Sequence, residues 1–547
     1  MTKLNRGTRL VTQPMTTEKT PTGRTHQGAP GWERDARTEL FLRATTVFAG
    51  EGQFYEKDKA ADDRAIELIR ELAVTDWGWV AGFLPWLRSE GNIRTSAIML
   101  ACEAADARSK VTYEQHFKNP SPYYQSLTPR KVVDAVLQRG DEPAEAIQYC
   151  LRTWGRIPAA VKRGAADAMV RLWGERAVIR YDKPDRPMRF ADAIDLAHPD
   201  PKAPWQSALF RYLLDERHDH EGNFEMLEAI RSRKALSTLT PKERHTLAAI
   251  ALDDPESDQG WMIMRAMAGQ WEWLMSWLGE GTKGTKDWSP LTERQRWELV
   301  IPQMGYMALI RNLRNFEQAG MKPEQVKAVC ERISDPEEVA KSRQFPYRFL
   351  SAHLNTKGAQ WLGALETAVS YSTGNVPSLD GMTHILVDCS GSMDWLTDAD
   401  KERRNKLWAA GRTPPEYPTR AQQALLFAFA LAARNPGRTE IFLFAIQSYG
   451  PIHVQQGASI LRAVTEAQQI GRRLGGGTQL EQNLRLTFDP GKHTRSVILT
   501  DEQAFPHGRP DAAWMIPETT PLYVWNVAGY THGAIQYGPN KVGLGGL

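Results

Sequence analysis

The chain has 547 residues, too many for a single hydrophobic core, and this length indicates about two to four domains. Hydrophobic residues make up 41% of it and charged residues 24%, as in ordinary soluble globular proteins. The formal net charge is only +3, which excludes a chain that is polybasic throughout, so any basic binding surface must be local.

The cysteines are far apart in the sequence and form no CxxC pair, which argues against a disulfide framework and a cysteine-based zinc site. They are Cys102, Cys150, Cys330 and Cys389. No apolar run approaches the roughly 18 residues that a membrane span requires, and the N-terminus lacks the apolar core of a signal peptide. We therefore expect a cytoplasmic protein.

Residues 1–33 are rich in Thr, Gly and Pro, and basic residues outnumber acidic ones in most of this stretch. Such a composition offers little that could bury a core, so it predicts a disordered basic tail.

Residues 34–374 show helical periodicity almost throughout, as in Val132, Val133, Val136 and Leu137. Helix starts are marked where a capping side chain precedes a proline, at Thr128-Pro129, Thr240-Pro241 and Asp335-Pro336. Prolines 129, 143 and 158 open successive short amphipathic segments. Because helices this short must stack on their neighbours, we predict a solenoid of antiparallel helix pairs of the HEAT-like kind.

Residues 375–547 have a different pattern, in which apolar strands alternate with helices. The predicted strands are 384–388, 441–446, 496–500 and 522–527, and the first two flank a helix over 419–434 that Thr419 caps. This alternation predicts a parallel sheet covered by helices on both faces, a doubly wound α/β domain. The polar, Pro-rich segment 394–418 is predicted to be a surface insertion.

A candidate metal site follows the first predicted strand. Asp388, Ser390 and Ser392 form a DxSxS motif at its carboxyl end, where α/β sheets place their ligand sites. Thr478 ends a Gly-rich loop (Gly475–Thr478), and Asp501 ends another strand. These hard oxygen ligands predict a divalent ion, Mg²⁺ before Ca²⁺. DxSxS alone is compatible with simple helix capping; the three pieces in this order favour the metal.

Together these three pieces resemble the metal-ion-dependent adhesion site of von Willebrand factor A domains. The resemblance implies that Ser390, Ser392 and Thr478 coordinate the ion directly or through water, while Asp388 and Asp501 supply charge. It also implies a recognition role, in which the ion captures a carboxylate of a partner.

The helical part resembles the TROVE module of Ro ribonucleoproteins. The stretches that carry the resemblance are FLRATTVFAGEGQFYEKDK (41–59), ERAVIRYDKPDRPMRFADAIDLAHPDPK (175–202), MALIRNLRNFEQAG (307–320) and FPYRFLSA (345–352). DCSGSM (388–393), GGGTQL (475–480) and LTDEQ (499–503) in the second part are Ro-like as well.

This resemblance implies a ring of helical repeats closed by the A domain. It implies that small noncoding Y RNAs bind a basic outer face and that single-stranded 3′ ends of structured or misfolded RNAs enter a central hole. The protein would then be a monomeric adaptor in RNA quality control or decay, not an enzyme, and Y RNA would tether it to a 3′-to-5′ exoribonuclease.

A local basic tract supports an RNA-binding face. Residues 152–189 hold ten basic residues against four acidic ones, a local excess that is larger than the charge of the whole chain. By position in the family motif, Arg180 and His198 match RNA-contacting positions. Lys183 and Arg186 lie beside a third position with the spacing offset by about one residue, and Lys162 and Arg163 are the next candidates. The alternatives are a solvated helix face and, for His198, a structural histidine.

Two other functions compete with RNA binding. One is a metal-dependent protein-binding scaffold without an RNA role, which only the metal motif supports. The other is a metal-dependent nuclease, which needs clustered carboxylates and a general base. The motif offers two Asp among hydroxyls and no evident base, so the nuclease is disfavoured. Two features depart from the family pattern: the 394–418 insertion beside the metal loop, and the absence of a final helix after the last predicted strand.

Overall fold

The computed structural model describes most of the chain. The described residues are 21–25, 29–46, 58–111, 127–218, 224–279, 288–342, 344, 346–373, 376, 378–394, 398–411, 414–455, 457–504, 511–527, 532–538 and 540–545. They form two compact units. The helical unit is Ile69–Val329, and the mixed unit combines Met1–Leu68 with Cys330–Leu547. The predicted boundary near residue 375 lies inside the mixed unit and does not separate the two compact units.

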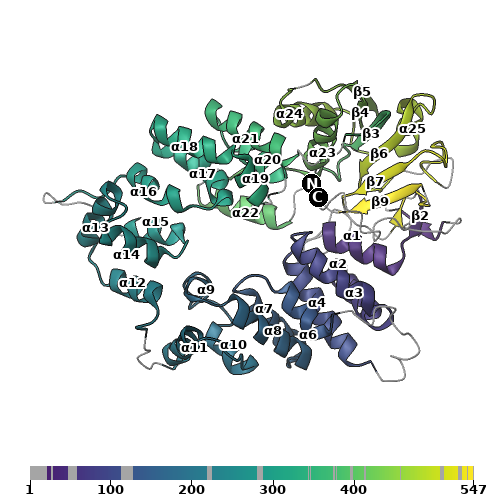
Figure 1. The fold of residues 1–547 in the computed structure, drawn as a ribbon. Helices are drawn as coiled ribbons and strands as arrows, with labels where there is room; N and C mark the ends of the chain where they lie inside the picture. The colour runs from purple at the N-terminus through teal and green to yellow at the C-terminus, as the bar shows by residue number, and fades with distance from the viewer. Residues whose placement is uncertain are drawn as a thin grey trace. The chain divides into compact units, whose positions relative to one another are not determined.

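The helical unit is built of short helices that pack on their neighbours, such as α6 on α4 and α8, and α14 on α12 and α13 (Figure 1). Its helices are α3 (Trp77–Ser89), α4 (Thr95–Ser109), α6 (Pro129–Val136), α7 (Glu142–Trp154), α8 (Ala159–Leu172), α9 (Glu175–Tyr181), α10 (Phe190–Ala197), α11 (Pro204–Arg217), α12 (Glu228–Ser237), α13 (Pro241–Asp253), α14 (Asp258–Met267), α15 (Trp271–Gly279), α16 (Glu293–Val300), η3 (Ile301–Gln303) and α17 (Tyr306–Ala319). This packing confirms the predicted helical-repeat architecture. None of the helices that the structure describes is both long enough and apolar enough to cross a membrane.

The predicted helix starts are found where the sequence places them. Helix α6 begins at Pro129 and α13 at Pro241, in both cases after a threonine in extended conformation. The Thr240 side chain accepts a hydrogen bond from the Glu243 amide, and Glu243 in turn accepts from the Thr240 amide, which completes a capping box. Local capping chemistry therefore sets the ends of these helices.

Close contacts between α6, α8 and α10 form a core of the helical unit. Trp173 stacks on Phe190 with ring centroids 4.1 Å apart, and both rings are fully buried. Gly164 of α8 faces α6 so closely that a Cβ atom on it would lie 2.7 Å from the carbonyl oxygen of Arg130. A side chain at this position would push the two helices apart.

The mixed unit centres on a sheet of six strands in the order β5-β4-β3-β6-β7-β9. All neighbours are parallel except β4 and β5. The strands are β3 (Met382–Asp388), β4 (Thr439–Phe444), β5 (Ser448–Ile452), β6 (His493–Thr500), β7 (Leu522–Asn526) and β9 (Lys541–Gly545). The helices are α1 (Ala36–Thr46), α19 (Pro336–Ser342), α20 (Pro346–Leu354), α21 (Ala359–Ser372), α22 (Asp398–Ala409), α23 (Arg420–Arg434), α24 (Ile460–Gly471) and α25 (Leu480–Thr487), while α2 (Asp58–Thr75) and α18 (Pro323–Ile333) run across the unit boundaries.

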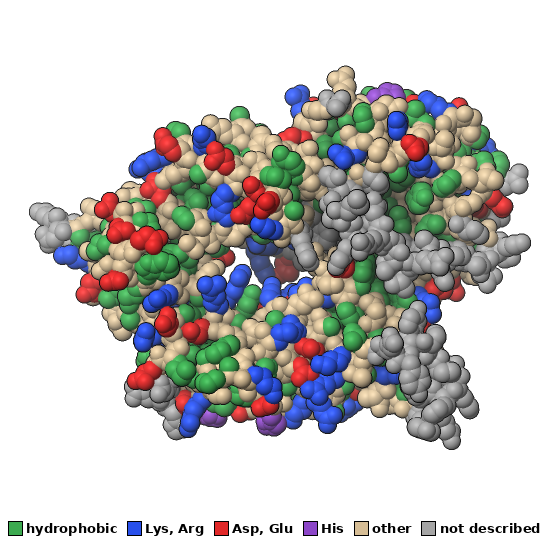
Figure 2. Space-filling view, viewed as in Figure 1, with side chains coloured by type: hydrophobic (Ala, Val, Ile, Leu, Met, Phe, Trp, Pro, Cys, Tyr) green, Lys and Arg blue, Asp and Glu red, His purple; other side chains and the backbone are tan. Residues whose placement is uncertain are grey.

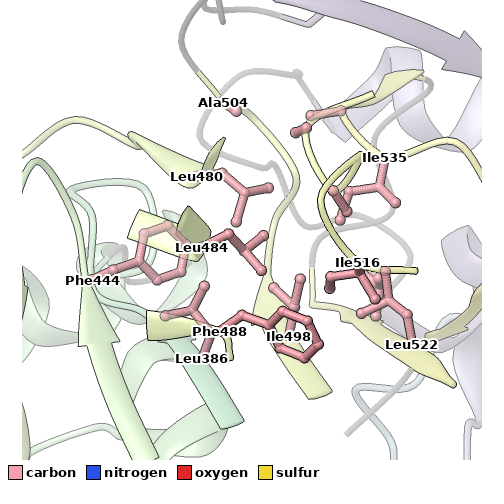
Figure 3. Close-up of a cluster of buried hydrophobic side chains, with 14 of the residues drawn as sticks. Leu386, Phe444, Leu480, Leu484, Phe488, Ile498, Ala504, Ile516, Leu522 and Ile535 are labelled. Atoms are coloured by element: carbon pink, nitrogen blue, oxygen red, sulfur yellow. The ribbon is translucent and has the colours of Figure 1, made fainter. Parts of the chain in front are cut away.

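Helices cover both faces of this sheet, with α23 and α24 on one side and α25 on the other (Figure 1). On the α25 side, Leu480 and Leu484 pack with Phe444, Leu386 and Ile498 in one buried cluster (Figure 3). The predicted doubly wound α/β architecture is confirmed. The structure adds the antiparallel strand β5, the last strand β9 and, within the predicted 394–418 insertion, helix α22.

The prediction of a disordered tail over residues 1–33 is wrong where the structure describes this stretch. Strands β1 (Gly23–Arg24) and β2 (Pro30–Glu33) form a three-stranded sheet with β8 (His532–Gly533). Trp32 is 1% exposed and Ala29 is completely buried. Their burial depends on partners about 500 residues away, which local composition does not reveal. Residues 1–20 and 26–28 lie outside the described part.

Candidate metal centre and basic face

The five predicted metal-site residues come from the carboxyl edge of the sheet. Asp388 is the last residue of β3, and Asp501 directly follows β6, the parallel neighbour of β3. Because parallel neighbours end at the same edge, the two carboxylates lie on the same rim. The loop that follows β3 is joined to the Gly-rich loop by a hydrogen bond from the Gly391 amide to the Gly476 carbonyl, 3.0 Å long. The structure therefore brings the three predicted pieces to one edge.

All five side chains are buried. Relative exposures are 0% for Asp388, 1% for Ser390, 3% for Ser392, 0% for Thr478 and 0% for Asp501. The Asp388 carboxylate accepts hydrogen bonds from the Ser390 amide at 2.9 Å and from the Thr500 hydroxyl at 2.7 Å. The Ser390 and Ser392 hydroxyl oxygens are 3.3 Å apart. Thr500 is a site residue that sequence reasoning missed, although its place just before Asp501 at a strand end was a signal.

Two oxygens of this group are buried without a hydrogen-bond partner in the part of the chain that the structure describes. They are Oγ1 of Thr478 and Oδ2 of Asp501. A buried oxygen with no donor is energetically costly unless something else satisfies it. These two oxygens, on two different loops, are therefore available to coordinate a metal ion.

The pKa values of the two carboxyl groups are also consistent with a cation site. Burial, with a further contribution from the charge of Asp501, raises the pKa of Asp388 to about 7. Burial also raises the pKa of Asp501, while the nearby Ser392 hydroxyl lowers it. Two buried carboxylates repel each other, and a divalent cation between them would remove that repulsion.

The donor set suits a hard cation rather than a soft one. Two carboxylates and three hydroxyls are the ligand types of Mg²⁺ and Ca²⁺. Among the residues that the structure describes, no group of three or more His, Cys, Asp or Glu side chains converges on a possible metal position. The types of donor present therefore fit Mg²⁺ held in part through water.

The predicted RNA-binding residues lie on and after consecutive helices of the helical unit. Arg163 on α8, Arg180 on α9, Arg186 and His198 are exposed. Lys162 and Lys183 are half-buried. His198 ends α10 with a backbone φ of 52°. Figure 2 shows Lys and Arg side chains gathered over α6 and α8, with fewer Asp and Glu side chains among them.

Two of these residues, Arg180 and Lys183, have local contacts with side-chain or backbone groups. The Arg180 guanidinium lies 5.3 Å from the centre of the Tyr181 ring, and Arg139 lies 5.2 Å from the same ring. Lys183 donates a hydrogen bond to the Ile179 carbonyl at 2.7 Å. Burial, and then the charge of Arg233, lowers the pKa of Lys183. Arg180 is thus the better placed of the two to meet a phosphate.

In the fold, ion pairs neutralise part of the positive charge of the basic tract, residues 152–189. Four of its arginines form ion pairs, three of them with carboxylates from outside the tract. The pairs are Arg156 with Asp106 (2.6 Å), Arg171 with Asp134 (2.9 Å), Arg186 with Glu145 (3.6 Å) and Arg189 with Asp182 (2.7 Å). The other six form no ion pair with a carboxylate of the described residues; they are Arg152, Lys162, Arg163, Arg176, Arg180 and Lys183.

The chain is similar to a family model and to several known proteins. Residues 290–435 match the TROVE domain. The telomerase protein component 1 of Mus musculus and that of Rattus norvegicus are both 39% identical to it over 59 residues, which is 10% of this chain. The chain spans about 2% of the length of these relatives.

A solved structure covers much more of the chain. The crystal structure of the Ro (RSR) protein of Deinococcus radiodurans matches with a TM-score of 0.54 and 18% sequence identity. The match covers 90% of this chain and 92% of that protein. The chain therefore shares the fold of this Ro protein, and its residues 290–435 match the TROVE domain.

Proposed function

We propose that this chain is an RNA-binding component of a Ro-like ribonucleoprotein. The observation that carries the proposal is the set of six cations on α7, α8, α9 and the segment after α9 that have no carboxylate partner among the described residues. Cations without a carboxylate partner attract a phosphate backbone, because binding releases its condensed counterions. The TROVE match and the likeness to a Ro protein support the same function.

The proposed ligand is a small structured RNA of the Y type, bound on the face that carries Lys162, Arg163, Arg180, Lys183, Arg186 and His198. Phosphate contacts of this kind position an RNA but carry little sequence information. We expect shape and a single-stranded 3′ tail to select the RNA. The protein would then act as a monomeric adaptor in RNA quality control or decay and would present the RNA to a 3′-to-5′ exoribonuclease.

The proposed role is binding without cleavage. A nuclease that uses metal ions needs clustered carboxylates and a group that activates water. The candidate metal centre has only two carboxylates among hydroxyls, fewer than such a cluster requires. RNA bound to the basic face would therefore not be cut by this chain. A partner nuclease would cut it instead.

Ultraviolet crosslinking tests the RNA-binding face directly. The purified full chain is irradiated with a structured RNA that carries a 3′ tail, and crosslinked peptides are identified by mass spectrometry. We expect crosslinks within residues 152–202. Crosslinks confined to peptides of α23, α24 and α25 would contradict the proposed face.

A second function, metal-dependent recognition of a protein partner, is favoured by the unpartnered Oγ1 of Thr478 and Oδ2 of Asp501. We propose that Asp388, Ser390, Ser392, Thr478 and Asp501 hold Mg²⁺, directly or through water. When bound, the ion supplies a Lewis-acidic position for a partner's carboxylate oxygen. Purified protein that binds Mg²⁺ but no RNA would favour this scaffold function over the first.

A further inference from the structure

The described part of the N-terminal segment, residues 22–25 and 29–34, is built into the mixed unit close to the candidate metal centre. Strand β2 pairs with β8, with Trp32 opposite Gly533. The Thr25 hydroxyl donates a hydrogen bond to the carbonyl of Ala504, 2.9 Å away and 479 residues later in the chain. This segment therefore contacts the loop that begins with Asp501.

The strongest link between the segment and this loop is a buried ion pair. Arg34 Nη2 lies 2.7 Å from Glu502 Oε2, and the two side chains are 2% and 0% exposed. The Glu502 carboxylate also accepts hydrogen bonds from the side-chain amide of Asn526 and, at 2.6 Å, from the Tyr537 hydroxyl. Without Arg34, Glu502 would be a buried carboxylate without this positive partner, which strongly destabilises its present position.

The backbone at Glu502 is held in an uncommon conformation. Its φ is 60°, in the left-handed region that residues with a side chain rarely adopt. Such a conformation persists only when surrounding contacts enforce it. The contacts of the Glu502 side chain, and Arg34 above all, are the groups that enforce it here. The direction in which the chain leaves Asp501 thus depends on the N-terminal segment.

Glu502 is also connected to the other carboxylate of the centre. The Thr500 hydroxyl accepts a hydrogen bond from the Glu502 amide at 3.0 Å and donates one to Asp388 Oδ2 at 2.7 Å. A shift of Glu502 would therefore move groups that hold both Asp388 and Asp501.

From these contacts we infer that Arg34 is a positioning residue for the divalent-metal centre and that docking of residues 29–34 and metal binding stabilise each other. This inference rests on the proposed metal site. Residues that orient metal ligands typically change metal affinity by roughly 10- to 100-fold when they are removed. Coupling of this kind is reciprocal, so the metal must also stabilise the docked segment.

The first test measures Mg²⁺ affinity by calorimetry on the full chain, at a temperature where circular dichroism shows every variant folded. Arg34→Met is compared with Arg24→Met, which removes the same charge from an exposed position of the same segment. We expect about tenfold weaker binding for Arg34→Met and unchanged binding for Arg24→Met.

A pair of glycine variants repeats this test without a change of charge. A Cβ atom at Gly533 would lie 2.5 Å from Glu502 Oε1 and 2.8 Å from Arg34 Nη2, whereas at Gly538 it would meet nothing within 4 Å. Gly533→Ala should weaken Mg²⁺ binding and Gly538→Ala should not. The two glycine variants therefore test whether the position of Arg34 and Glu502, and not only their charge, affects Mg²⁺ binding.

The second test uses the unmodified chain and so does not depend on the folding of a variant. Hydrogen exchange is measured with and without saturating Mg²⁺, and amides of residues 29–33 and 501–504 should exchange more slowly with the metal. Equal Mg²⁺ affinity for Arg34→Met and the unmodified chain, or unchanged exchange at 29–33, would overturn the inference alone. Absence of Mg²⁺ binding by the unmodified chain would overturn the metal proposal itself, and this inference with it.

Discussion

Asp388 and Asp501 lie at the ends of adjacent parallel strands, and both carboxyl groups are completely buried. Without a cation, the two buried carboxylates repel each other when both are ionised, which is unfavourable. A bound cation would remove this repulsion, so the pair can serve as a binding site. Burial raises the pKa of both groups, and the charge of Asp501 raises that of Asp388 further. This arrangement leads to two predictions.

Asp388→Asn should abolish Mg²⁺ binding and leave the fold intact. The amide has nearly the shape of the carboxylate and can still accept a hydrogen bond from the Ser390 amide, but it lacks the charge that the ion requires. In EDTA at about pH 4, where the folded protein keeps the Asp388 carboxyl protonated, the free energy of unfolding should change by less than about 1 kcal/mol, because one neutral group replaces another of nearly the same shape. Calorimetry and denaturant unfolding measure the two effects. Equal Mg²⁺ affinity in the variant would contradict the proposed site.

The contribution of Asp388 to the stability of the metal-free protein should decrease as the pH rises from about 4 to about 7. In the folded protein the pKa of Asp388 is about 7, above its ordinary value of 3.8. Between these values the folded state keeps a proton that the unfolded state has released, so the contribution of this group is present at low pH and is lost on deprotonation. Thermal unfolding in EDTA should show this component, and Asp388→Asn should remove it. An identical pH profile for both proteins would show that Asp388 titrates normally.

Helix packing in the helical unit can be tested at two glycines. Gly164→Ala should destabilise the protein by about 1–3 kcal/mol, because its Cβ would lie 2.7 Å from the Arg130 carbonyl and 2.8 Å from Val133 Cβ. The control is Gly82 of α3, where a Cβ meets nothing within 4 Å, and Gly82→Ala should stabilise by about 0.5–1 kcal/mol. Urea unfolding measures both, and a stable Gly164→Ala variant would show that the α6–α8 contact is looser than described.

Local features of the structure were predictable from the sequence. Thr419 caps α23 through a complete capping box, and strands β3, β4, β6 and β7 lie where runs of apolar residues predict them. Both signals act over a few residues and need no knowledge of the rest of the fold. The order of the DxSxS, Gly-Thr and Asp motifs also predicted their meeting, because parallel strands end at one edge.

Features that depend on distant partners were not predictable. Trp32 is buried by a sheet whose third strand contains Gly533, and strands of two to four residues show no periodicity. The charge of the basic tract was overestimated because Asp106 and Asp134, from outside it, neutralise Arg156 and Arg171. Contacts of this kind are set by tertiary packing alone.

The chain should bind RNA tails but should not cut them. End-labelled RNA with a 3′ tail should stay intact during incubation with the pure protein and Mg²⁺, and it should shorten only when a 3′ exoribonuclease is added. Tailed RNA should also bind more tightly than a blunt duplex of equal length, since single strands offer a flexible backbone. Shortening by the chain alone, abolished by Asp388→Ala, would identify an enzyme.

The measurement that tests the account most directly is the salt dependence of RNA affinity for a charge-reversed basic face. Arg163→Glu with Arg180→Glu reverses two exposed cations that have no carboxylate partner among the described residues, and Arg186 is left unchanged because it lies 3.6 Å from Glu145. Arg434→Glu with Arg473→Glu, both exposed on the mixed unit, is the matched control. Each lost phosphate contact flattens the slope of log affinity against log salt by roughly 0.7–0.9. We predict weaker binding with a slope flatter by about 1.4–1.8 for the first pair and no change for the control. Equal affinity and slope for both pairs would contradict RNA binding at this face.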